Sequence, residues 1–256
     1  MPDHSQMKLG KKPARHDSRT LEMGTYLTPE LPVAPSSIDY SKGITDWGVM
    51  LNDRLACCTI AAIGHAIQTW TVNAGSRNDF SDDAVRLYYE KWDGYDPKNP
   101  ASDQGGVELD VLNSWRNDPL GFAGRKLDAY VSIHLSDSLS LLRTDMMDAI
   151  WLFGGAYIGV ELPRTAQTQE VWDTATGPEA EAGSWGGHAI FVNAYDLDTL
   201  TCITWGQSKK MTWAWFQTYC EEAYALVSKD WLNAQGVSPS GLNLEQLETD
   251  LKSISQ

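Results

Sequence analysis

The chain has 256 residues, 42% of them hydrophobic, with 11 tryptophans, which excludes a disordered polymer and suffices for one large domain or two lobes. Its formal net charge of -14 argues against nucleic acid as the main partner, because a polyanion repels an acidic body. No apolar run approaches the roughly 18 residues of a membrane span, and the N-terminus lacks the apolar stretch of a secretion signal. We therefore expect a cytoplasmic or virion-associated protein with no membrane partner.

Residues 1–31 are expected to form an extended, basic N-terminal arm. Residues 1–20 contain five Lys or Arg and two Asp, which gives them a charge of +3. Because the whole chain has a net charge of -14, the remaining residues carry -17. Two interpretations of this arm stay open. It is either an interaction segment for an acidic protein partner or a solvated terminus, and the second is the commoner case.

Residues 32–124 are expected to form a helical lobe that contains an unusual thiol. A polar turn from Asn52 ends in Cys57 and Cys58 and runs directly into a helix over residues 59–73, whose apolar residues are Ile60, Ile63, Ile67, Trp70 and Ala74. Unpaired N–H groups and the positive end of a helix dipole stabilise a thiolate, so this position predicts a lowered pKa for Cys58. The alternative is that both cysteines simply pack beneath the helix start.

Two more helices are predicted in this lobe. Ser81 is the expected N-cap of the first, which continues through Trp92. A polar loop then ends in Gly105-Gly106, and a helix starts near Val107.

Residues 125–235 are expected to form a β-rich lobe. A helix is predicted over residues 138–153 and another over 212–222, with strands over 156–162, 188–195, 200–205 and 223–227 and a long polar loop over 164–187. Asp196 to Thr199 is expected to turn the middle two strands into a hairpin. Residues 236–256 are expected to form an amphipathic tail helix, which is docked on the body or offered to a protein partner.

The four cysteines do not have the paired spacings of a zinc site or of a redox motif. We therefore expect four reduced thiols, with no metal and no cofactor.

Several motifs in chain order resemble the papain-like cysteine peptidases. Asn52 stands six residues before Cys58, Gly105-Gly106 precedes a helix, and His188 opens a strand in an H-A-x-x-x-x-x-Y pattern that ends at Tyr195. Ile203-Thr204-Trp205-Gly206 is similar to the family's Asn-Ser-Trp-Gly element, and Pro35 to Tyr40 is similar to its mature N-terminal segment. The whole pattern is also similar to papain-fold proteins encoded by bacteria and phages.

The resemblance implies an α+β fold with two lobes, the first helical and the second an antiparallel, barrel-like sheet. It implies Cys58 as nucleophile, His188 as general base and acid, and Asn52 as a donor to the oxyanion. It also implies that Gly105, Gly106 and Trp205 bind a peptide or protein substrate. A thiolate beside an imidazolium is nucleophilic at neutral pH, and the same histidine would later protonate a leaving amine.

The sequence departs from the family pattern where the histidine is normally oriented by an asparagine, because Ile203 stands there. Pairing Asp196 with Thr199 places Gln207 opposite His188, and a register slipped by one or by three residues selects Gly206 or Thr204 instead. Gln207 and Thr204 are both candidates for the orienting residue.

Only about 35 residues precede the body, so a separate activation propeptide is not expected. Three functions stay open. The first is a cysteine peptidase or amidohydrolase, the second is a catalytically silent papain-fold structural or binding protein such as a phage particle component, and the third is a thiol acyltransferase.

Overall fold

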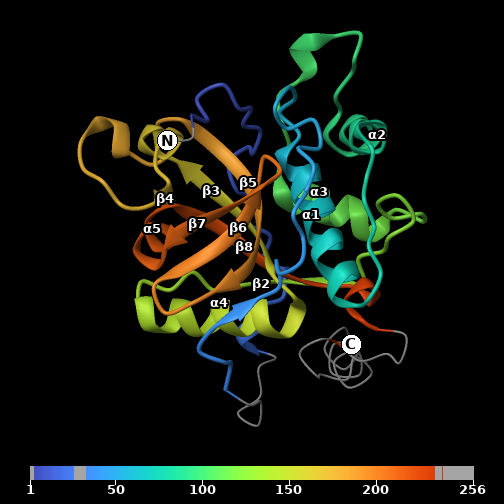
Figure 1. The fold of residues 1–256 in the computed structure, drawn as a ribbon. Helices are drawn as coiled ribbons and strands as arrows, with labels where there is room; N and C mark the ends of the chain where they lie inside the picture. The colour runs from blue at the N-terminus through green and yellow to red at the C-terminus, as the bar shows by residue number, and fades with distance from the viewer. Residues whose placement is uncertain (1–2, 26–32, 234–237, 239–256) are drawn as a thin grey trace.

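The computed structural model describes residues 3–25, 33–233 and 238. Figure 1 shows helices α1, α2 and α3 on one side and a mixed sheet on the other. The helices of the first side are α1 (Cys58–Asn73), α2 (Asp82–Asp93) and α3 (Glu108–Asn117). The predicted helices are confirmed, and Ser81 caps α2 as expected by accepting a hydrogen bond from the Ala84 amide.

Helix α1 is the buried centre of the molecule. Nearly all of its residues are inaccessible to solvent, because it packs against the sheet on one side and against α2 and α3 on the other. The Trp70 indole donates to the Phe153 carbonyl at 2.9 Å, and the Tyr157 hydroxyl donates to the Thr59 carbonyl at 3.1 Å. The bond from Tyr157 holds the N-terminal end of α1 against the sheet, and the bond from Trp70 holds the C-terminal half of the helix.

Eight strands in the described residues form one sheet in the order β2-β8-β3-β5-β6-β7-β4, with β1 paired to β5. Their bounds are β1 Ile38–Asp39, β2 Ala129–Ser132, β3 Ala156–Leu162, β4 Val171–Trp172, β5 Gly186–Tyr195, β6 Thr199–Thr204, β7 Gln207–Thr212 and β8 Cys220–Val227. All pairs are antiparallel except β4 with β7. Helices α4 (Leu139–Phe153) and α5 (Trp213–Tyr219) pack on this sheet.

The predicted β5–β6 hairpin is confirmed, but the chain after it differs from the prediction. Trp205 and Gly206 both have left-handed backbone angles, with φ of 46° and 76°, which is the geometry of a two-residue hairpin turn. This turn allows residues 207–212 to return as β7, which the sequence analysis did not predict. The predicted helix over 212–222 is wrong beyond Tyr219, because residues 220–222 pair with β3 as part of β8.

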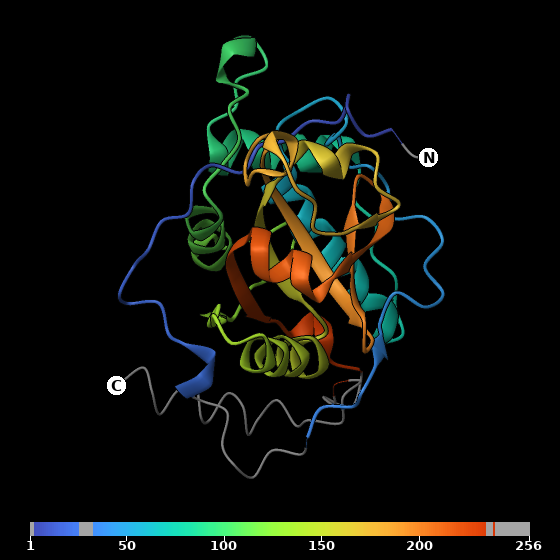
Figure 2. The same cartoon turned by 90° about the vertical axis from the view of Figure 1, so that its left-hand side faces the viewer.

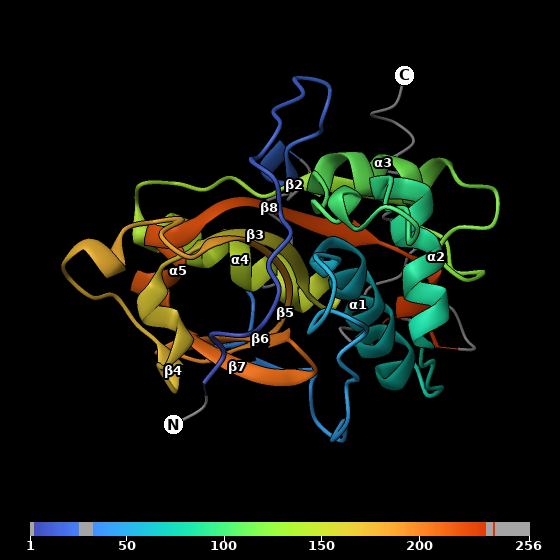
Figure 3. The same cartoon turned by 90° about the horizontal axis from the view of Figure 1, so that it is seen from above.

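The N-terminal segment, defined as residues 3–15, lies across the junction between α1 and the sheet (Figure 3). Figure 2 follows the dark blue chain from there to the short helix Met23–Thr25, where the Leu21 carbonyl accepts a hydrogen bond from Ser132. The interpretation of the arm as a solvated terminus is therefore wrong for residues 3–15. Within these residues, Lys11 forms ion pairs with Glu161 and Glu222 of the same chain.

The predicted tail helix over residues 236–256 falls outside the described residues, apart from Ser238. Within the described part of the chain, no helix has the length and apolar character needed to cross a membrane.

Candidate active site

Cys58 is the first residue of α1 and lies against β5. Its Sγ atom accepts a hydrogen bond from the Ala189 amide at 3.4 Å, and its side chain is fully buried. The neighbouring Cys57 has a different environment, because its thiol faces the carbonyl of Met50 at 3.4 Å. Of the two cysteines, Cys58 is the one that the fold brings to the β5 strand.

The predicted lowering of the Cys58 pKa is wrong for this state of the protein. Burial raises the pKa of Cys58 to about 12, and hydrogen bonds from the amides of Ala189 and Gly10 offset only part of that effect. The helix start stabilises the thiolate, but the free energy lost by removing water from the thiolate is larger than the stabilisation from the backbone dipoles. Cys58 is therefore a neutral thiol while the N-terminal segment covers it.

His188 lies in β5 directly before the residue whose amide contacts Cys58. Its Nε2 atom is 2.7 Å from the Thr204 hydroxyl, and its ring stacks on Trp205 with centroids 4.6 Å apart. Its Nδ1 atom is buried and has no hydrogen-bond partner among the described residues. Burial, and after it the charge of His65, lowers the pKa of His188 to about 3, so this ring is neutral.

A bulge in β5 shifts the pairing of this strand with β6. Ala194 pairs with Thr201, but Val192 pairs with Cys202, so Asn193 is the extra residue and the register slips by one. Continued along β5, the shifted register places Thr204 opposite Ile190, on the same face of the strand as His188, and the Thr204 hydroxyl is 2.7 Å from the imidazole. Gln207 is exposed and pairs with Thr204 at the start of β7, so the structure does not bring this second candidate to His188.

Asn52 and Trp205 direct N–H groups at the same oxygen atom. The Asn52 side chain is buried, and its Nδ2 donates to the carbonyls of Leu55 at 3.2 Å and Lys8 at 3.4 Å. The Trp205 Nε1 donates to the same Lys8 carbonyl at 3.2 Å. The two side chains thus form a pair of donors that can hold a carbonyl oxygen. The sequence analysis assigned Trp205 to substrate binding without anticipating this donor role.

Gly105 and Gly106 form the helical wall of the junction. The Tyr89 hydroxyl donates to Asp103 at 2.8 Å and accepts from the Gly105 amide at 2.9 Å, which fixes the turn. Gly106 then binds an extended chain through both of its backbone groups. Its amide donates to the Gly10 carbonyl, and its carbonyl accepts from the Lys12 amide, each at 2.8 Å.

The N-terminal segment is held on the sheet side as well. The Lys11 amide donates to the Gly187 carbonyl at 3.1 Å, and the His4 ring stacks on Trp205 with centroids 5.1 Å apart. Gly10 passes so close to the α1 start that a Cβ atom there would lie 1.8 Å from the Ala56 carbonyl oxygen. Only glycine fits at this position.

The segment contacts Cys58 through a backbone amide. The backbone amide of Gly10 faces the sulfur, whereas a nucleophile attacks a carbonyl carbon. The bound segment therefore covers Cys58. The sequence analysis missed this role of Gly10, and the only signal was a glycine between basic residues.

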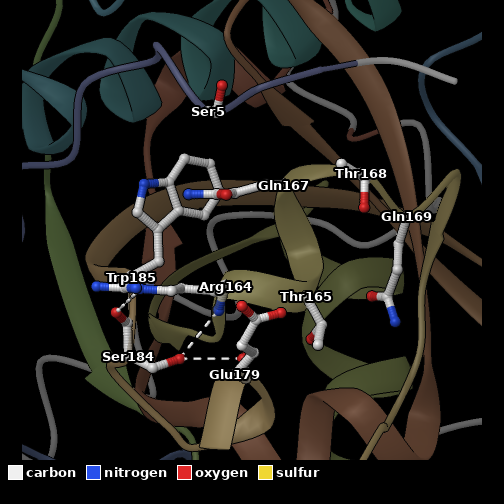
Figure 4. Close-up of a pocket in the computed structure, with 9 residues that line it drawn as sticks. All are labelled: Ser5, Arg164, Thr165, Gln167, Thr168, Gln169, Glu179, Ser184 and Trp185. Carbon is white, nitrogen blue, oxygen red and sulfur yellow. Dashed lines mark hydrogen bonds between the residues drawn. The ribbon is translucent and has the colours of Figure 1, made fainter.

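A hollow of about 680 Å³ lies beside the site on the sheet side (Figure 4). Trp185 lines it and packs on Trp205 with ring centroids 5.5 Å apart, and Ser5 of the N-terminal segment lies at its border. The Arg164 Nε donates to the Ser184 carbonyl at 3.0 Å, as Figure 4 shows, and braces this wall. The hollow extends the junction beyond Trp205.

Neither the models of protein families nor the curated protein sequences gave a match to this chain. Solved structures did. Xylellain, a cysteine protease from Xylella fastidiosa, has a TM-score of 0.63 at 14% identity and covers 88% of this chain and 97% of its own. Digestive procathepsin L 3 of Tenebrio molitor has a TM-score of 0.55 at 12% identity, over 88% of this chain and 77% of its own. The bromelain protease from Ananas comosus has a TM-score of 0.53 at 13% identity, over 75% and 99%.

These neighbours confirm the α+β class and the architecture that the sequence motifs predicted. The chain has the fold of the papain-like cysteine proteases.

Proposed function

We propose that this chain is a cysteine peptidase or amidohydrolase that the structure captures in a closed, latent state. Cys58 is the nucleophile, His188 the general base and acid, and Thr204 the residue that positions the imidazole. Asn52 is a donor to the oxyanion, and Gly105 and Gly106 bind the substrate backbone. The substrate is a peptide or protein.

The main support for this proposal is that the junction between α1 and the sheet binds a polypeptide backbone. An extended polypeptide is hydrogen-bonded to Gly106 on one wall and Gly187 on the other, and it passes directly over Cys58. Two side-chain donors also converge on one of its carbonyl oxygens. A junction that holds a peptide backbone against a thiol in this way suits acyl transfer.

Once the segment leaves, the chemistry has two steps. In the first, His188 removes the thiol proton of Cys58, the thiolate attacks the substrate carbonyl carbon, and the tetrahedral oxyanion is held by Asn52 and the Cys58 amide. The C–N bond then breaks, the amine leaves with the proton from the imidazolium, and a thioester remains. In the second, His188 takes a proton from water, the resulting hydroxide cleaves the thioester to a carboxylic acid, and the thiol is restored.

A second candidate function is a catalytically silent papain-fold binding protein. The observation that favours it is the neutral state of both groups, because burial raises the pKa of Cys58 to about 12 and lowers that of His188 to about 3. Cys58 and His188 are both neutral because burial excludes water from them. The two candidates therefore differ in what happens when the junction is opened.

Gly10→Val opens it without changing any residue of the site, because its side chain cannot fit against Ala56. We expect iodoacetamide at pH 6 to label Cys58 rapidly in this variant, and His188→Ala in the same background to abolish the rapid labelling. An activated ion pair reacts at a pH where an ordinary thiol does not. Labelling of Gly10→Val at the rate of an ordinary thiol, independent of His188, would favour the silent protein.

A further inference from the structure

We propose that the pocket filled by the Lys11 side chain is a specificity pocket that selects a lysine-type cationic side chain in the substrate. This inference rests on the proposed function, because it names the substrate class of the same site. The pocket, called the Lys11 pocket below, is formed by Gly159 and the carboxylates of Glu108, Glu161, Glu221 and Glu222.

The Lys11 side chain is completely buried although it carries a charge. Its Nζ atom is 3.3 Å from Glu161 Oε1 and 3.5 Å from Glu222 Oε1, and it donates a hydrogen bond to Glu221. Burial works against the ammonium form, but the carboxylates, Glu108 foremost, outweigh it and hold the pKa of Lys11 above its usual value. The pocket stabilises a cation even without water.

Glu108 is the most deeply buried carboxyl group of the pocket, and its charge is opposed by that of Lys11. It is fully buried at the first position of α3, and neither of its oxygen atoms has a hydrogen-bond partner among the described residues. Burial, and after it the charge of Glu222, raises the pKa of Glu108. A buried carboxyl group without a hydrogen bond is costly, and the positive charge of Lys11 is what opposes this cost.

The shape of the pocket fits an unbranched side chain with a terminal charge. Gly159 in β3 supplies the space, because a Cβ atom there would lie 2.2 Å from Lys11 Cε and 2.9 Å from Glu108 Oε1. The β3–β8 pairing is irregular between Gly159 and Val160, which places Glu222 and Cys220 on either side of this step. The methylene groups of Lys11 therefore lie along the β3 strand at Gly159, and its ammonium group lies among the four carboxylates.

The backbone groups around Lys11 are those expected to hold a substrate. Lys11 lies between Gly10 and Lys12, which bind Gly106, and its own amide binds Gly187. Gly10, the next residue, faces Cys58. A substrate that uses the same two walls would place one of the side chains nearest its scissile bond in the Lys11 pocket.

The first test measures hydrolysis of peptide amides by Gly10→Val. Substrates carry lysine, its neutral isostere norleucine, or glutamate at each of the three positions on either side of the scissile bond. We expect lysine to raise kcat/KM at least about tenfold over norleucine at one position, the range of a charge-assisted hydrogen bond. Glu108→Gln or Glu222→Gln should erase the preference, whereas Glu90→Gln, which removes an equal charge from the surface of α2, should retain it. Cleavage without a lysine preference at any position would overturn the proposal.

The second test does not depend on turnover. A labelled synthetic peptide of residues 6–15 is bound to Gly10→Val, whose own segment no longer fits, and is compared with the same peptide containing norleucine at position 11. We expect at least about tenfold weaker binding of the norleucine peptide, by fluorescence anisotropy. Equal affinities would overturn the Lys11 pocket as a cation site. Lysine-dependent binding together with no hydrolysis of any substrate would instead contradict the proposed peptidase function and leave the pocket in place.

Discussion

Removing the charge of Lys11 should open the protein. Lys11→Met keeps the aliphatic length of the side chain but leaves the carboxylates of Glu108, Glu161, Glu221 and Glu222 facing one another without a cation. Removing one partner of a buried ion pair typically costs about 3–5 kcal/mol. Glu161 and Glu221 are 29% and 36% exposed, so water relieves part of the effect and the lower value of about 3 kcal/mol applies.

This cost falls mainly on the docked state, because the carboxylates regain water when the segment leaves. At about 1.4 kcal/mol per tenfold change, the open population should rise roughly 100-fold. The closed state contributes little to thiol chemistry, since a Cys58 pKa of about 12 instead of the reference 9.0 lowers the thiolate fraction roughly a thousandfold at neutral pH. The alkylation rate of Cys58 therefore reports the open population.

The assay is alkylation at pH 8 followed by peptide mass spectrometry, with Lys8→Met as the matched control. Lys8 belongs to the same segment and bonds the site through its backbone carbonyl, so its side chain should be dispensable. We expect Lys11→Met to label Cys58 up to about 100-fold faster than both the wild type and Lys8→Met. Equal rates for all three proteins would refute the conclusion that the Lys11 charge holds the segment in place.

Three further changes test the site and the core. Thr204→Val removes the 2.7 Å contact with His188 and leaves a buried ring nitrogen unpaired, so we expect kcat/KM of the opened enzyme to fall about tenfold or more; an unchanged kcat/KM would contradict this. Trp70→Ala should cost about 3–5 kcal/mol in urea unfolding, because the ring is fully buried and its indole N–H bonds Phe153; a loss below about 1 kcal/mol would contradict the packing. Burial lowers the pKa of His65 to about 4 from 6.5, so the unfolded chain binds the extra proton between these values. The stability from neutral His65 is present above pH 6.5 and is lost as pH falls toward 4, and His65→Gln should reduce the pH slope of stability by up to about 1.4 kcal/mol per pH unit; identical slopes would refute the assignment.

The secondary structure near Cys58 was predictable because local patterns determine it. The apolar residues at 3.6-residue spacing defined α1, and Ser81 defined the start of α2. The overextended helix after Thr212 has the opposite cause. Its apolar residues suit either a helix or a strand, and pairing with β3 selected the strand from Cys220 onward.

The parts of the site that escaped prediction depend on contacts between distant segments. The bulge at Asn193 puts Thr204 on the face of β5 that carries His188, and the turn at Trp205-Gly206 takes Gln207 into β7. A register count from the turn at Asp196 includes neither feature. The pKa of Cys58 depends on burial beneath residues nearly fifty positions away. Likewise, the carboxylates around Lys11 come from α3, β3 and β8, so only the fold reveals that the basic arm meets them.

The central claim is that Cys58 cleaves peptides once the N-terminal segment is displaced. Its most direct test is to incubate Gly10→Val with a mixture of peptides of many sequences and to identify new termini by mass spectrometry, with Gly10→Val/Cys58→Ser as the control. The proposed mechanism predicts cleavages that depend on Cys58, with lysine enriched at one fixed position relative to the scissile bond. Product mixtures that are the same with and without the Cys58 thiol would contradict it.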